Sequence, residues 1–184
     1  MGLDQHAQQK MDNNSKKYQA EIFTPIEIGW KVIEHRIIAL ENEAFPTYPY
    51  SQEDLHTAFT NTENTVVLLK ETGSDQLVGY VYSVMVDTWY PERISERNET
   101  VVLDNIVLDK SCRGQHLAET MTNLFEDELR RKKFKYFEVN ANIPNGYAAK
   151  IERAYKDRIV EGPIRKPLGE DAQFGPRNGY KIKL

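Results

Sequence analysis

The chain has 184 residues, of which 40% are hydrophobic and 28% charged, a composition typical of one soluble globular domain with a substantial core. A formal net charge of −4 and a pI near 5.7 give no reason to expect nucleic-acid or anionic-membrane binding, which require a basic field. One cysteine excludes an intramolecular disulfide and a zinc site built on several thiolates, and no apolar run approaches the ~20 residues of a membrane span. We therefore expect no metal, no membrane and a cytoplasmic location.

The composition of the chain changes after residue 17, from a polar segment to one with regularly spaced apolar residues. Residues 1–17 are rich in Gln, Asn, Asp and Lys and are expected to be a disordered tail, which leaves 18–184 as the folded domain. A short strand is predicted within residues 18–28 from its apolar residues. Pro25 indicates that this strand lies at a sheet edge or contains a bulge, because proline cannot donate to a sheet ladder. A helix is predicted over 29–43, with Arg36 on its solvated side. Its core-facing stripe consists of Trp30, Ile33, Ile37 and Leu40.

A second helix and a hairpin follow. Ser51 is a favourable N-cap residue and predicts a short helix that ends near Thr60. Strands are predicted over 65–70 and 77–86, joined by a Gly-Ser-Asp turn. Gly79, inside the second strand, indicates a bulge or a close backbone approach.

The segment 101–133 carries the main functional signal, after a charged excursion over 87–100. A β-branched strand runs into a short polar loop that contains Cys112 and Gly114. Cys112 is interpreted as a filling residue, because no nearby His–Asp arrangement activates it. After the loop, apolar residues recur at helical spacing: Leu117, Met121, Leu124, Phe125 and Leu129.

A strand that passes through a Gly-containing loop into a helix N-terminus can bind an anion. Backbone N–H groups at the turn lack intrahelical partners, and the helix dipole adds partial positive charge there. We therefore hypothesise a phosphate-bearing ligand at residues 113–118. An ordinary connection that binds nothing is the alternative at this point.

The C-terminal third alternates strands and helix. The predicted elements are a strand over 136–139, a loop over 140–146, a helix over 147–158, and strands over 159–164 and 180–184. The Gly/Pro-rich segment 167–179 between the last two strands is interpreted as a loop. Hairpins followed by β-α-β predict an α/β (α+β) fold with a mixed sheet and helices on both faces.

With these elements in place, residues 65–160 resemble the GNAT superfamily of acyl-CoA-dependent N-acyltransferases. The pyrophosphate loop of that family has the pattern Arg/Gln-x-x-Gly-x-Gly/Ala. The segment from Arg113 to Ala118 matches at its first and last positions, and His116 stands where glycine is usual. The resemblance implies a single GNAT-like domain with a mostly antiparallel sheet and a splayed cofactor cleft. The cofactor-binding residues it implies are Ile106, Val107, Leu108, Arg113, Gly114, Gln115, His116, Leu117, Ala118, Asn140 and Asn145.

The resemblance also implies a reaction, the transfer of an acetyl group from acetyl-CoA to a primary amine in a ternary complex. Asp104, on the central strand, is the first candidate for the general base; a structural carboxylate that caps a neighbouring loop is the alternative. Tyr155 is the candidate acid for the departing sulfur, with a core tyrosine as its alternative. Glu138 is a second candidate base, and strand parity is expected to point it away from the side of Asn140.

Two functions are consistent with this reading. One is an N-acetyltransferase whose acceptor is an amine-bearing small molecule or a protein amine, with a homodimer as an allowed assembly. The other is a catalytically silent CoA-binding or regulatory domain of the same fold, for which His116 and the irregular second helix would be the signature.

Overall fold

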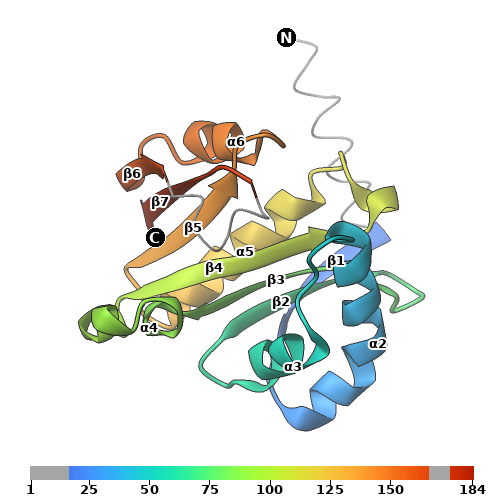
Figure 1. Cartoon of the computed structure of the whole chain (residues 1–184). Helices are drawn as coiled ribbons and strands as arrows, with labels where there is room; N and C mark the ends of the chain where they lie inside the picture. The colour runs from blue at the N-terminus through green and yellow to red at the C-terminus, as the bar shows by residue number, and fades with distance from the viewer. Residues whose placement is uncertain (1–16, 166–174) are drawn as a thin grey trace. The chain divides into compact units, whose positions relative to one another are not determined.

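A computed structural model describes residues 17–165 and 175–184 (Figure 1). The expected disordered tail, apart from Lys17, and most of the predicted loop 167–179 lie outside the described residues. Seven strands form one sheet in the order β1-β2-β3-β4-β5-β7-β6. The β1–β2, β5–β7 and β6–β7 pairs are antiparallel, and β4–β5 is parallel. The predicted mixed, mostly antiparallel sheet is therefore confirmed.

The chain forms two compact units. Of the described residues, the first comprises those up to Tyr82 together with Asn105–Glu128, and the second comprises Ser83–Asp104 together with those from Leu129 to Leu184. The elements that lie in the first unit, wholly or in part, are β1 (Tyr18–Phe23), α2 (Glu27–Ala44), α3 (Gln52–Thr60), β2 (Thr65–Glu71), β3 (Leu77–Met85), β4 (Thr100–Leu108), η2 (Lys110–Cys112) and α5 (Leu117–Arg131).

The two N-terminal helices form as their patterns predict. The stripe on α2 is buried, with Trp30 2% and Ile37 0% exposed. A capping box starts α3, because the Ser51 hydroxyl accepts from the Asp54 N–H and the Asp54 carboxylate accepts from the Ser51 N–H. Trp30 and Phe59 then pack with ring centroids 5.6 Å apart, and α2 and α3 lie side by side (Figure 1).

Within this unit, helices lie on both faces of β3. The Tyr80 ring meets Phe59 of α3 edge to face, and its hydroxyl donates to Glu41 of α2. Successive strand residues point to opposite faces, and a Cβ built on neighbouring Gly79 would lie 3.5 Å from Met121 of α5. That Cβ would also lie 2.8 Å from the Val107 carbonyl oxygen. Gly79 therefore marks a close backbone approach, one of the two predicted alternatives.

The second unit contains two short helical segments that the sequence did not indicate, followed by a helix and strands that the sequence predicts with partly different ends. They are α4 (Val86–Trp89), η1 (Pro91–Glu96), β5 (Tyr136–Asn142), α6 (Tyr147–Ala154), β6 (Ile159–Arg165) and β7 (Arg177–Lys183). The excursion 87–100 thus holds two short helical segments. The prediction that β5 ends at Val139 is wrong, because Asn140, Ala141 and Asn142 pair with Gly179, Asn178 and Arg177 of β7.

Candidate functional site

A hydrogen-bonded turn connects β4 to α5 in the first unit. Asp109 accepts from the Ser111 N–H at 2.9 Å and from its hydroxyl at 2.7 Å. These bonds, and then the guanidinium of Arg36, hold the pKa of Asp109 below its ordinary value. Arg36 also donates from Nε to the Leu77 carbonyl at 2.8 Å. The expectation that Arg36 is solvated is wrong, since helical periodicity takes no account of a loop that packs beside the helix.

The backbone after this turn is left-handed at two residues. Gly114 has φ +75°, and nothing lies within 4 Å of a Cβ built there. His116 also has a left-handed backbone, with φ +62°. Within residues 17–165 and 175–184, the N–H groups of Gly114, His116, Leu117 and Ala118 donate to no protein acceptor. They precede or begin α5, whose dipole adds positive potential.

Side chains of this loop fold back onto the protein. Arg113 donates from Nε to the Leu108 carbonyl at 3.2 Å, and Gln115 donates from Nε2 to the Ser111 carbonyl at 3.0 Å. Cys112 is 2% exposed, and its thiol donates to the Tyr18 hydroxyl at 3.7 Å. The buried thiol fits the interpretation of Cys112 as a filling residue.

The end of β4 alternates as the sequence predicts. Asn105 and Val107 are buried, whereas Ile106 and Leu108 are partly exposed. Asn105 donates to the carboxylate of Glu41 at 3.0 Å, and Glu41 is 1% exposed. Glu41 also accepts from the Tyr50 N–H at 3.0 Å, which ties the loop after α2 to that helix. Sequence reasoning missed Glu41. It directly follows Leu40 of the apolar stripe, and a charged residue beside such a stripe is ordinarily expected at its solvent-exposed edge.

In the second unit, Asp104 is held by a tryptophan. The Trp89 indole N–H donates to Asp104 Oδ1 at 2.7 Å, and Trp89 is 49% exposed. The parallel register aligns Val102 with Glu138 and, among the described residues, ends at Leu103 and Val139. Asp104 therefore lies just beyond the last paired residue of β4. Strand alternation puts it on the face of the sheet that carries Glu138.

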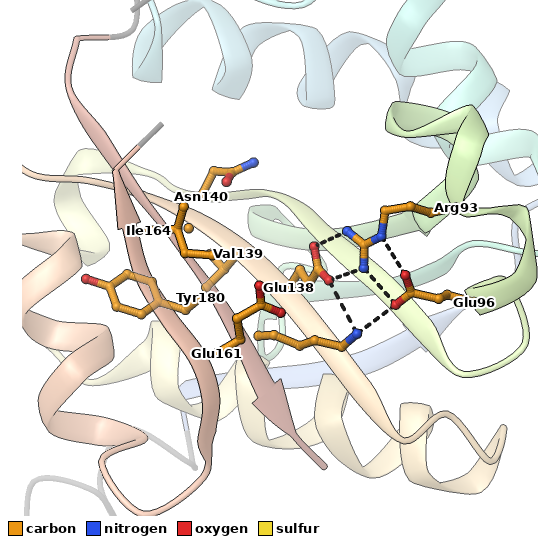
Figure 2. Close-up of a pocket in the computed structure, with 10 residues that line it drawn as sticks. Arg93, Glu96, Glu138, Val139, Asn140, Glu161, Ile164 and Tyr180 are labelled. Atoms are coloured by element: carbon orange, nitrogen blue, oxygen red, sulfur yellow. Dashed lines mark hydrogen bonds and ion pairs between the residues drawn. The ribbon is translucent and has the colours of Figure 1, made fainter. Parts of the chain in front are cut away.

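A charged cluster from η1, β5 and β7 lies on that face (Figure 2). Arg93 donates to both oxygens of Glu138, at 2.9 and 2.5 Å, and to both oxygens of Glu96, at 2.8 Å each. Lys181 donates to Glu96 at 2.7 Å and lies 3.9 Å from Glu138. Hydrogen bonds from Arg93 and then Lys181 lower the pKa of Glu96 to about 2.

This cluster borders a cavity of 310 Å³. The lining residues are Arg93, Glu96, Glu138, Val139, Asn140, Glu161, Ile164, Gly179, Tyr180 and Lys181. Glu138 and Asn140 line the same cavity, so the expectation that they point to different sides is wrong. The two residues lie two positions apart in the strand, and side chains at every second position of a strand point to the same face.

The remaining predicted residues lie around α6. Tyr155 caps the C-terminus of α6 instead of lying within the helix, and its ring meets Phe137 of β5 edge to face at 5.5 Å. The Asn145 side chain accepts from the Tyr147 N–H at 2.9 Å and so supports the first turn of α6. Burial raises the pKa of Tyr147 to about 12.

Comparison with known proteins shows the family to which this chain belongs. The model of the acetyltransferase (GNAT) family matches residues 33–150. The chain belongs to this family. The GNAT match contains β4, the loop at residues 113–118, α5, β5 and the first half of α6. No curated protein matches the chain in sequence.

Solved structures share the GNAT fold with this chain at low identity. The NatC complex bound to Gag peptide and CoA contains a chain that is 13% identical, with a TM-score of 0.67 and coverage of 91% of this chain and 99% of that one. An aminoglycoside 6′-N-acetyltransferase complexed with coenzyme A is 14% identical, with a TM-score of 0.62 and coverage of 90% and 96%. The ribosomal-protein-S18-alanine N-acetyltransferase from Escherichia coli is 16% identical, with a TM-score of 0.59 and coverage of 90% and 93%.

The GNAT pattern usually has glycine at the position of His116, and the backbone conformation there gives the reason. A φ of +62° lies in the left-handed region, which glycine adopts freely and other residues adopt at a cost. Histidine is among the non-glycine residues enriched in that region. The His116 side chain points into solvent, 66% exposed, with Nδ1 3.5 Å from Glu119. His116 therefore adopts a backbone conformation that glycine adopts freely.

Two absences apply to the described part of the chain. No group of three or more His, Cys, Asp or Glu side chains there is arranged to hold a metal ion. None of its helices combines the length and apolar character needed to cross a membrane.

Proposed function

We propose that this GNAT protein is an acetyl-CoA-dependent N-acetyltransferase that acts on a primary amine. The observation that carries the proposal is the loop at residues 113–118. It combines two left-handed residues, Gly114 and His116, with backbone N–H groups that have no acceptor among the described residues. Such a loop at the start of a long helix is suited to the pyrophosphate of CoA.

The residues proposed to hold the cofactor are those that the family pattern implies. Arg113 and the loop N–H groups would bind phosphate, the backbone of Ile106–Leu108 would run along the pantetheine arm, and Asn140 and Asn145 would contribute from β5 and the start of α6. When bound, acetyl-CoA supplies an acyl group activated as a thioester. The rest of the chemistry depends on side chains that move protons.

Asp104 is proposed as the base. A primary amine with a pKa of about 10.4 is almost wholly protonated at neutral pH, so it must lose a proton before it can attack. Asp104 lies on a partly exposed face just beyond the paired part of β4, and the Trp89 indole fixes its orientation. Glu138 is the weaker candidate, because its two oxygens are both engaged by Arg93.

Two further groups complete the proposed reaction. Charge that develops on the thioester oxygen would be received by a backbone N–H near Leu108. Tyr155 would supply a proton to the departing sulfur. Because a thiol has a pKa near 8.5, the sulfur leaves readily as thiolate and the acid contributes little.

One observation favours a second candidate, a CoA-binding domain without catalysis. Asp104 is engaged by Trp89 at 2.7 Å, which is also what a purely structural carboxylate would show. Under this alternative the loop still binds CoA but no amine is acetylated.

Calorimetric titration with acetyl-CoA, followed by an assay of amine-dependent thiol release, tests the proposal. Binding together with thiol release in the presence of a primary amine is expected. Binding without turnover across a broad panel of amines would establish the non-catalytic alternative. The absence of binding would refute both.

A further inference from the structure

The cavity in the second unit lies over strands β5, β7 and β6. Six of its lining residues form two neighbouring rows across these strands, as the register shows: Glu138, Lys181 and Glu161, and then Asn140, Gly179 and Ile164. Gly179 is the middle member of the second row. Because it has no side chain, it leaves space between Asn140 and Ile164, and the hollow is deepest in side-chain terms at this position.

The backbone of β7 does not require a glycine at position 179. The residues with a left-handed backbone include Gly162 and Gly175 but not Gly179. A close approach nearby restricts Gly162, since a Cβ built there would lie 2.6 Å from the Gly179 carbonyl oxygen. A glycine inside a strand weakens it and often marks a place where a ligand or another backbone approaches closely. The space above Gly179 is therefore a candidate ligand site.

Two register shifts in β6 select the side chains on the far wall of the cavity. A regular β6 would present Val160 and Gly162 at the positions opposite β7. The shifts on either side of Glu161 place Glu161 and Ile164 there instead. Bulges of this kind re-aim side chains and are over-represented next to active sites. They bring a carboxylate and an apolar side chain to the cavity wall.

The charges around the cavity leave one carboxylate without a counterion. Arg93 and Lys181 are balanced by Glu96 and Glu138, through hydrogen bonds of 2.5 to 2.9 Å (Figure 2). Glu161 is exposed and forms no ion pair with any residue in the described ranges. Two cations and three carboxylates line the cavity in all, so one negative charge is in excess. The cavity therefore favours a ligand with a single positive charge.

We propose that this cavity binds a small primary alkylammonium ion. The ammonium pairs with Glu161, and the carbon chain lies over Gly179 against Ile164. A metal ion fits less well, because hard cations need several oxygen ligands and one carboxylate is open here. A volume of 310 Å³ suits a small organic molecule. The site uses neither the loop at residues 113–118 nor Asp104, so the inference goes beyond the proposed function.

Titration of the whole chain with hexylamine and with 1-hexanol, followed by protein NMR, tests charge and space separately. Hexylamine is almost wholly protonated at neutral pH, and we expect it to bind about three- to tenfold more tightly than hexanol. Glu161→Gln should remove this difference by weakening hexylamine alone. Gly179→Val fills the hollow without changing charge and should weaken both ligands about tenfold.

Two controls make the result specific. Asp157→Asn removes a carboxylate at an exposed residue outside the cavity lining and should leave both affinities unchanged. Urea denaturation should show that Gly179→Val is at least as stable as the wild type, because strands favour valine over glycine. Equal affinity of the wild type for hexylamine and hexanol, an absence of hexylamine binding, or wild-type affinity for hexylamine in either Glu161→Gln or Gly179→Val would overturn the proposal.

Kinetic measurements distinguish an acceptor of the proposed acetyl transfer from a separate effector. For an acceptor, the KM for hexylamine should rise in Gly179→Val in step with its dissociation constant. For an effector that binds apart from the reaction, the KM of the acetylated amine should stay unchanged. Both results support the cavity as an alkylammonium site. Hexylamine binding without thiol release from acetyl-CoA for any amine would count against the proposed function alone and leave this site in place.

Discussion

His116 offers a sharp test of how the proposed cofactor loop, residues 113–118, is held in its conformation. Its φ of +62° places an L-residue in the left-handed region, which costs about 1–2 kcal/mol per residue. Glycine avoids that cost but loses about 0.5–1 kcal/mol through the greater entropy of the unfolded chain. The imidazole adds little, because it is 66% exposed and lies 3.5 Å from Glu119, a surface pair worth no more than about 0.5 kcal/mol.

These magnitudes predict an order of stability. We expect His116→Gly to change the free energy of unfolding by between about −0.5 and +1.5 kcal/mol, and His116→Ala, which keeps the left-handed strain and loses the surface pair, to lower it by at most about 0.5 kcal/mol. Urea denaturation followed by tryptophan fluorescence measures both values. Titration with CoA should show that His116→Gly binds at least as tightly as the wild type, because the backbone N–H groups become more accessible.

A second left-handed residue provides the control. Lys133 has φ +68° and lies after α5, outside the loop. Lys133→Gly and Lys133→Ala should show the same order of stability without any change in CoA affinity. Equal stability of His116→Gly and His116→Ala would refute the role given to backbone conformation. A loss of CoA affinity in both would show that the imidazole itself binds the cofactor.

Three further predictions concern the core, the base and the charged cluster. Gly79→Ala should lower the free energy of unfolding by about 1–3 kcal/mol in urea denaturation, because its Cβ would lie 2.8 Å from the Val107 carbonyl oxygen; an unchanged midpoint would contradict the close approach. Asp104→Asn should lower kcat about 100-fold in the thiol-release assay with unchanged acetyl-CoA affinity, whereas Trp89→Phe, which leaves the carboxylate in place, should lower it far less; equal losses would point to a structural role for the pair. The pKa of Glu96 is lowered from 4.5 to about 2, so its stabilisation is complete above pH ~4.5 and is lost as the pH falls toward 2. Glu96→Gln should therefore show a shallower acid-unfolding curve over that range, and superimposable curves would refute the assignment.

Much of the fold follows from local patterns in the sequence. The apolar stripes predict α2 and α5, with Trp30 and Ile37 fully buried as expected, and Ser51 predicts the start of α3. The order of elements predicts the mixed sheet, and the strand-loop-helix at residues 113–118 directs attention to the proposed cofactor site. The helices and the strand-loop-helix depend on residues close together in the sequence, so periodicity and capping chemistry are sufficient to predict them, whereas the mixed sheet follows from the order of elements along the chain.

The tertiary structure alone decided the contacts between distant residues. The length of β5 depends on its pairing with β7, about forty residues later in the chain, so the polar run from Asn140 to Asn142 could not indicate a strand by itself. The engagement of Glu138 by Arg93 and of Asp104 by Trp89 depends in the same way on where the segment 87–100 folds back. Ion pairs and hydrogen bonds between separate elements have no sequence period. The sequence therefore determined the framework and the strand-loop-helix at residues 113–118, and the tertiary contacts decided which acidic side chains are engaged by other residues.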